Sequence, residues 1–156
     1  MRFTLLTRAN TSMMDFDLNL VVQQSDENPV FYVQYAHARM ASILRTAAER
    51  GFTPSTWGDG DLSLLVHPAE MALLRKMLEL PELIEKAVLQ LAPHTLPFYA
   101  GDLASTFHAF YRDCRVISSD PADTALTCAR LRLVAATKAV FVRVLGLIGV
   151  SAPEAM

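Results

Sequence analysis

Three side chains in the first half of the sequence have the types and the spacing that nucleic-acid binding needs. Tyr32, Tyr35 and Arg39 follow one another at intervals of three and four residues, so on a helix they share one face. Arg50 follows Arg39 by eleven positions, about three helical turns, and returns to that face. Aromatic rings offer flat surfaces on which unstacked bases lie, at about 1–3 kcal/mol per base, and arginine binds phosphate.

A second set of aromatic and basic residues comes later in the sequence. His108, Tyr111, Arg112 and Arg115 lie beside an apolar stripe with the spacing of a helix. The alternative interpretation is that tyrosines next to such a stripe pack their rings inward and turn only their hydroxyls to water, while the arginines are ordinary solvated side chains. The pattern alone leaves both interpretations open.

No residue pattern indicates catalysis. The sequence has neither GxxxxGKS/T nor GxGxxG, the glycine-rich patterns that hold phosphates. Its four histidines are scattered and have no cysteine at zinc-ligand spacing. One of them, His37, falls on an apolar stripe, where a hydrogen-bonded core histidine is expected. We therefore assign no catalytic residue, no metal and no cofactor to this chain, and expect a module that binds a partner.

The composition predicts one soluble domain. The 156 residues are 52% hydrophobic and 19% charged, which suits a domain with its own core. No apolar run approaches the roughly 20 uncharged residues of a membrane-spanning helix, and no signal-peptide pattern follows Met1. Cys114 and Cys128 are expected as buried reduced thiols. We therefore expect a cytoplasmic protein without membrane contact.

The net charge of −2 limits how this chain can bind nucleic acid. A nucleic-acid site must either gather positive charge locally or rely on another domain for part of the binding.

Helical periodicity dominates from residue 29 onward. Pro29 predicts a helix start, because its missing N–H has no partner to lose there, and Gly51 predicts the end of that helix. A short helix nearer the N-terminus is expected to end near Gln24. Further helices are expected at 68–80, at 81–92, from 94 or 97 to a break at 118–121, and at 122–147, with an irregular loop at 52–66.

Two apolar stripes at intervals of three and four define the expected core and predict an all-α bundle. The first stripe is Val30, Val33, His37, Met40, Leu44 and Ala47, and the second is Leu96, Tyr99, Leu103, Phe107, Phe110 and Cys114.

Several motifs resemble the C-terminal part of arginyl-tRNA synthetases. Residues 15–18 read DFDL and residues 28–39 read NPVFYVQYAHAR, similar to that family's junction between its catalytic and anticodon-binding domains. The family's closing motifs have counterparts in the same order: FHAFY at 107–111, CRV at 114–116, ARLRLV at 129–134, LGLIGV at 145–150 and PEAM at 153–156. The resemblance covers essentially the whole sequence.

The resemblance implies an all-α helical bundle of the class I aminoacyl-tRNA synthetase anticodon-binding type, a domain named for its DALR motif. That domain is expected at residues 29–156, with residues 1–28 as a remnant of the junction with the catalytic domain. The DALR position here reads Thr-Cys-Ala-Arg at 127–130, so Asp and Leu are absent while Ala-Arg remains. In the family, tyrosines matching Tyr32, Tyr35 and Tyr111 and a methionine matching Met156 lie against the anticodon loop. Together with the neighbouring arginines, the predicted tRNA-binding residues are Tyr32, Tyr35, Arg39, Tyr111, Arg112, Arg115 and Met156.

The function implied by the resemblance is anticodon recognition in the ATP-dependent attachment of arginine to tRNA-Arg. The implied partners are the anticodon loop of tRNA-Arg and the catalytic domain of the same synthetase, with a monomeric state. The HIGH-type and KMSKS-type signatures of the catalytic domain are absent from this chain, so ATP is assigned to the full-length enzyme only. The alternative function is a free-standing helical paralogue that acts as a protein-interaction or regulatory module.

Overall fold

The computed structural model describes residues 2–7, 25 and 27–156. Every regular element within these residues is helical, which confirms the all-α prediction. The short helix expected before Gln24 lies outside the described residues. In chain order the elements are α1 (Arg2–Leu6), α3 (Pro29–Glu49), α4 (Pro54–Trp57), η1 (Leu62–Leu64), α5 (Pro68–Leu78), α6 (Leu80–Leu89), α7 (Thr95–Asp113), η2 (Pro121–Asp123) and α8 (Thr124–Leu147). None of the helices in the described ranges has both the length and the apolarity needed to cross a bilayer.

Local sequence signals explain where α3 begins and ends. The Asn28 side chain accepts a hydrogen bond from the Val30 amide at 3.2 Å, and Pro29 occupies the first turn. Gly51 follows the helix with a φ of +86°, a left-handed conformation that favours glycine. Both ends of the predicted helix are therefore confirmed.

α7 ends one residue before its apolar stripe does. Cys114 belongs to the stripe but has an extended backbone, with φ −121° and ψ 122°. The chain then passes to η2, where the Asp120 side chain accepts a hydrogen bond from the Ala122 amide at 2.9 Å and prepares the start of α8. Arg115 consequently lies in the α7–α8 loop and not on α7.

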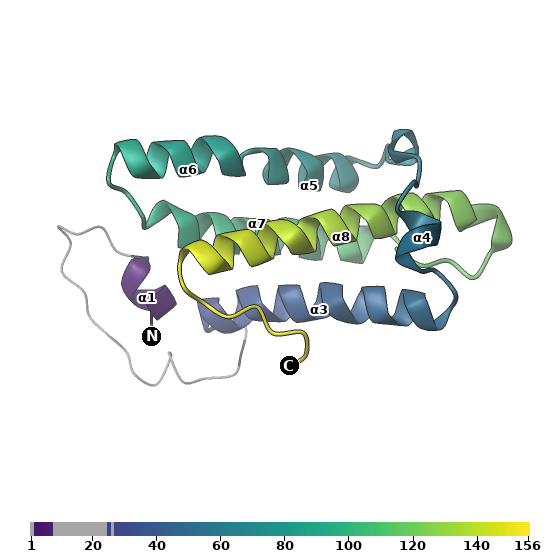
Figure 1. Ribbon diagram of the computed structural model, residues 1–156, viewed down its shortest axis with the longest axis horizontal. Coiled ribbons are helices and arrows are strands. Elements are labelled where there is room, and N and C mark those ends of the chain that lie inside the picture. The colour runs from purple at the N-terminus through teal and green to yellow at the C-terminus, as the bar shows by residue number, and fades with distance from the viewer. Residues whose placement is uncertain (1, 8–24, 26) are drawn as a thin grey trace.

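The long helices are arranged in three layers. α5 and α6 lie along one side of the molecule, α3 lies along the opposite side, and α7 and α8 lie between them (Figure 1). After α8 the chain turns back, and residues 150–156 run across α3 without helical structure. The α3 layer is therefore the one that carries the C-terminal segment.

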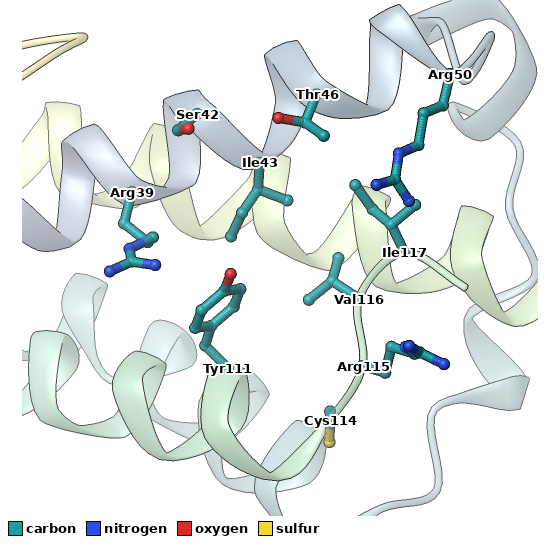
Figure 2. A pocket seen from close by; sticks show the side chains of 10 residues that line it. All are labelled: Arg39, Ser42, Ile43, Thr46, Arg50, Tyr111, Cys114, Arg115, Val116 and Ile117. Carbon is teal, nitrogen blue, oxygen red and sulfur yellow. The ribbon is translucent and has the colours of Figure 1, made fainter. Parts of the chain in front are cut away.

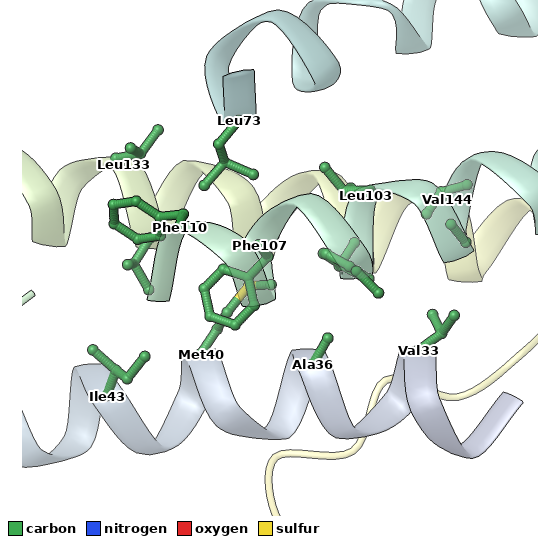
Figure 3. Packing of buried hydrophobic residues seen from close by; sticks show 14 of the residues in the cluster. Val33, Ala36, Met40, Ile43, Leu73, Leu103, Phe107, Phe110, Leu133 and Val144 are labelled. Atoms are coloured by element: carbon green, nitrogen blue, oxygen red, sulfur yellow. The ribbon is translucent and has the colours of Figure 1, made fainter. Parts of the chain in front are cut away.

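The core fills the space where α3, α5, α7 and α8 meet (Figure 3). Both predicted stripes are confirmed, because every member is buried or half-buried. Phe107, Phe110 and Met40 are fully enclosed at the contact of α7 with α3, and close packing at this contact holds the two helices in one register. Cys114 is buried, Cys128 is half-buried, and neither forms a disulfide.

The segment 52–66, expected as an irregular loop, contains α4 and η1 and is docked on α8. A Cβ atom added at Gly60 would lie 2.8 Å from the backbone carbon of Cys128, so only glycine permits this approach. The Arg132 guanidinium donates a hydrogen bond to the Gly60 carbonyl at 2.9 Å. The expectation of irregular structure was wrong because Pro54 and Asp61 start short helices here, Pro54 in a first turn and Asp61 as a cap.

Arg130, the arginine that remains at the DALR position, joins three parts of the bundle. Its Nε atom lies 2.7 Å from Oε1 of Glu70 on α5, and the two side chains are 15% and 1% exposed. Its Nη1 atom donates to the Arg115 carbonyl in the α7–α8 loop at 2.9 Å. The other carboxylate oxygen of Glu70 accepts from the His67 amide at 2.8 Å, at the start of α5. Both partners are thus satisfied, as a buried ion pair requires.

Arg130→Ala is expected to lower the free energy of unfolding by about 3–5 kcal/mol, because it leaves the buried Glu70 carboxylate without its cation. Urea denaturation followed by circular dichroism measures the change. Arg112→Ala is the matched control, since Arg112 pairs with Asp113 on the surface, where an ion pair contributes little. Equal losses in the two variants would show that the Arg130 pair is not a structural link.

Candidate nucleic-acid interface

Arg39 on α3 lies between two tyrosine rings that come from different helices. Its guanidinium carbon is 5.1 Å from the centroid of the Tyr35 ring and 5.2 Å from that of Tyr111 on α7. Its Nη2 atom donates a hydrogen bond to the Tyr35 hydroxyl. This hydrogen bond raises the pKa of the guanidinium above its ordinary value. The cation is therefore held over two π-faces and stays charged.

His108 on α7 extends this arrangement into a row of rings. Its ring centroid lies 6.1 Å from that of Tyr35, with the planes 27° apart, and 5.0 Å from that of Tyr32 in a tilted contact. We call Tyr35, Arg39, His108 and Tyr111 the aromatic face. Tyr111 is 38% exposed, so part of its ring is available to a ligand.

A groove with a volume of about 420 Å³ continues from the aromatic face along α3. Figure 2 shows Arg39 and Arg50 on its α3 side and Tyr111 and Arg115 on the opposite side. We call it the basic groove; its remaining lining is Ser42, Ile43, Thr46, Cys114, Val116 and Ile117. Burial raises the pKa of the Cys114 thiol, which favours its protonated form.

Among the described residues, no carboxylate forms an ion pair with an arginine of the basic groove. Within the part of the chain that the structure describes, no ion pair involves Arg50 or Arg115. Ser42 and Thr46 add hydroxyl groups between the guanidinium groups. Cationic and hydroxyl donors along a groove are the groups that position a phosphate backbone.

A second, smaller pocket opens on the other side of Arg39. It has a volume of about 200 Å³, and we call it the tail pocket because residues of the C-terminal segment form one of its walls. Its lining is Tyr35, Ala38, Arg39, Ser42, Arg45, Ala155 and Met156. Met156 is 55% exposed and offers a flexible apolar surface beside the Tyr35 ring.

The structure brings five of the predicted tRNA-binding residues to these two cavities: Tyr35, Arg39, Tyr111, Arg115 and Met156. Tyr32 is set apart, because its ring packs against the core and its hydroxyl lies 3.3 Å from the Ser105 hydroxyl. Arg112 is also set apart, because its guanidinium forms two hydrogen bonds with the Asp113 carboxylate.

The predicted set of tRNA-binding residues lacks four polar residues of the two cavities. Ser42, Thr46 and the C-cap residue Arg50 follow Arg39 at intervals of three, four and four, which places all of them on one face of α3. Helical spacing had already placed Arg50 on this face, and it could have found Ser42 and Thr46. The fourth, Arg45, lines a cavity only because the C-terminal segment closes the tail pocket, and no local pattern predicts that closure. Among the residues the structure places, no three His, Cys, Asp or Glu side chains gather as metal ligands.

The arrangement defines a helical module with an aromatic and arginine-rich face, and comparison with known proteins gives its class. The family model of the DALR anticodon binding domain matches residues 33–156, and the chain belongs to that family. Arginine–tRNA ligases are similar along nearly the whole chain: that of Dehalococcoides mccartyi strain CBDB1 is 53% identical over 155 residues, and that of Heliobacterium modesticaldum is 46% identical over 159. Each alignment covers 99% of this chain but only 27% and 28% of the respective relatives.

Solved structures share the fold. The arginyl-tRNA synthetase of Thermus thermophilus superposes with a TM-score of 0.79 at 34% identity, covering 99% of this chain and 26% of that one. A Campylobacter jejuni structure, described as an arginyl-tRNA synthetase, gives a TM-score of 0.84 at 24% identity over 99% of this chain and 32% of that one. The chain therefore spans about a quarter to a third of the proteins that it resembles.

Tyr111→Ala is expected to change the free energy of unfolding by no more than about 1 kcal/mol, as for other partly exposed positions. Phe107→Ala, four residues earlier on α7 and fully buried, is the matched comparison and should cost about 3–5 kcal/mol. Thermal and urea unfolding of both variants measure the difference. A large loss for Tyr111→Ala would mean that its ring is part of the core and not a binding surface.

Proposed function

We propose that this chain binds the anticodon loop of tRNA-Arg, as the RNA-binding part of an arginine–tRNA ligase. The observation that carries the proposal is the position of the Arg39 guanidinium between the Tyr35 and Tyr111 rings, at the point where the basic groove and the tail pocket meet. Family membership and the names of the similar ligases support the same conclusion.

In the proposed binding mode, the aromatic rings bind bases and the arginines bind phosphates. An unstacked base lies against Tyr111 or Tyr35, and stacking of this kind contributes about 1–3 kcal/mol per base. Arg50 and Arg115, which form no ion pair among the described residues, bind phosphates on the two sides of the basic groove. Because Arg39 is already held by two rings in the free protein, little side-chain order is lost when RNA binds.

The attachment of arginine is proposed to occur in a separate catalytic part of the same ligase. The sequence contains no nucleotide-binding signature, and the similar ligases are several times longer than this chain. ATP and arginine would bind in that other part, while this chain selects the tRNA through its anticodon loop.

Tyr35→Ala and Tyr111→Ala are each expected to weaken binding of tRNA-Arg by roughly 5- to 150-fold, the range that loss of one stacked base implies. Fluorescence anisotropy with labelled tRNA-Arg and with an unrelated tRNA measures affinity and preference. Phe98→Ala is the matched control, because Phe98 is an exposed ring on α7 that lies outside both cavities. Equal or absent binding of the two tRNAs by the unmodified chain would favour the protein-interaction module instead.

Arg50→Gln and Arg115→Gln are each expected to reduce the slope of log affinity against log salt by about 0.7, the value for one phosphate contact on a single strand. Titrations of tRNA-Arg at several salt concentrations give the slope. Arg75→Gln on α5, on the far side of the bundle from α3 (Figure 1), should leave it unchanged. Arg112→Gln should have a smaller effect than Arg115→Gln, because Asp113 already neutralises Arg112. Slopes that are the same in all variants would place the phosphates elsewhere.

A further inference from the structure

Residues 150–156, which we call the strap, are held on the bundle by side chains of two helices. The Gln34 amide on α3 donates to the carbonyl and the hydroxyl of Ser151, at 2.9 and 3.0 Å. The Lys138 ammonium on α8 lies 2.8 Å from the Glu154 carboxylate. These contacts are exposed, so water competes with them and each holds the strap weakly. Val150 and Ala152 pack against the core.

His37 provides an anchor from a buried side chain. Its side chain is fully buried on α3, and its Nδ1 atom lies 2.8 Å from the Pro153 carbonyl oxygen. Because a carbonyl oxygen only accepts, Nδ1 carries a proton and donates it to the Pro153 carbonyl. The described residues offer no hydrogen-bond partner to the other ring nitrogen, Nε2. The polar contact that accounts for an imidazole at this position is therefore the one with the strap.

The contact with His37 sets the position of the last residues of the strap. Pro153 is bound on α3 next to the helical turn that carries Tyr35 and Arg39, and the chain then continues to Ala155 and Met156, which form a wall of the tail pocket. The same pocket is also lined by Tyr35, Arg39 and Arg45. An apolar wall, a ring and two cations in a volume of about 200 Å³ suit one nucleotide, with its base at the ring and its phosphate at the arginines.

We propose that His37 is a positioning residue for RNA binding: by its hydrogen bond to Pro153 it fixes the path of the strap and so holds Met156 in the tail pocket with Tyr35, where the two side chains complete a nucleotide subsite. This inference rests on the proposed function, because the nucleotide belongs to the bound tRNA. His37 itself does not touch the RNA. Its effect is transmitted through the strap.

The test compares His37→Leu with His37→Asn in the 156-residue chain. Leucine fills the site without a donor, whereas the asparagine amide nitrogen is as many bonds from the backbone as Nδ1 is and can donate to the Pro153 carbonyl. His37→Leu should weaken tRNA-Arg binding about tenfold, the effect of one buried hydrogen bond on the occupied subsite, and His37→Asn should restore most of the affinity. Thr137→Val, which changes a buried polar side chain bonded to α5 and α8 only, controls for a general loss of stability and should not change the affinity.

The NMR signal of the Met156 methyl group reports the position of the strap in the absence of RNA. In the unmodified chain it should show the ring-current shift of a methyl near Tyr35, and in His37→Leu it should move to the position of a free methionine; Met156→Leu assigns the signal. Retention of the shift in His37→Leu overturns the inference. If leucine prevents folding, His37→Met, whose flexible side chain adapts to irregular space, replaces it with the same expectations.

A truncated chain that lacks residues 153–156 distinguishes an effect of His37 through the strap from an effect of His37 through core packing. If His37 acts through the strap, His37→Leu causes no further loss of affinity in the truncated chain, because the two changes remove one interaction. An equal additional loss shows that His37 acts through the core and overturns the inference. If the unmodified chain does not prefer tRNA-Arg, the proposed function fails, and the Met156 methyl shift alone then decides whether His37 fixes the strap.

Discussion

The contact of α3 with α7 is the constraint on which the binding surface depends. The two helices meet through buried side chains, among them Met40 and Phe107, and close-packed side chains of this size lock one register between neighbouring helices. Arg39 precedes Met40, and Tyr111 lies four residues after Phe107, so the register that buries the core also brings this guanidinium and this ring together. A shift of either helix by one residue would separate them. The aromatic face is therefore a direct consequence of the core.

The same geometry explains which features the sequence alone predicts. The stripes of α3 and α7, the end of α3 at Gly51 and the face shared by Tyr35 and Arg39 all arise from contacts within one or two helical turns, and helical spacing reveals them. The Arg130–Glu70 ion pair, the docking of Gly60 on α8 and the bond between His37 and Pro153 each join residues at least 60 positions apart. No local pattern predicts such pairs. For this reason the docking of the segment 52–66 on α8, the position of Arg45 and the tail pocket were not predicted.

A chain with a net charge of −2 can still present a cationic surface, because its positive charges are unequally neutralised. Lys76, Lys86 and Lys138 face carboxylates on the surface, and Arg130 faces one in the interior. Arg50 and Arg115, in contrast, lie on different sides of the basic groove without an acidic partner among the described residues. Charges that are left unpaired in a concave surface act on a phosphate at short range, where salt screens them least. Such an arrangement favours a few defined phosphate contacts over general attraction to nucleic acid.

The extended strap forms part of the wall of the tail pocket, and the contact that holds it there lowers the stability of the fold. The buried Nε2 atom of His37 has no partner among the described residues, and an unsatisfied buried group of this kind costs about 1–3 kcal/mol. A leucine would avoid that cost and fill similar space, but the only polar anchors left to the strap among those described would be the exposed ones, which contribute little. A histidine at this position therefore lowers the stability of the core and fixes the position of the strap. Since Met156 at the end of the strap has a flexible side chain, the backbone of the pocket is held in place while its surface remains adaptable.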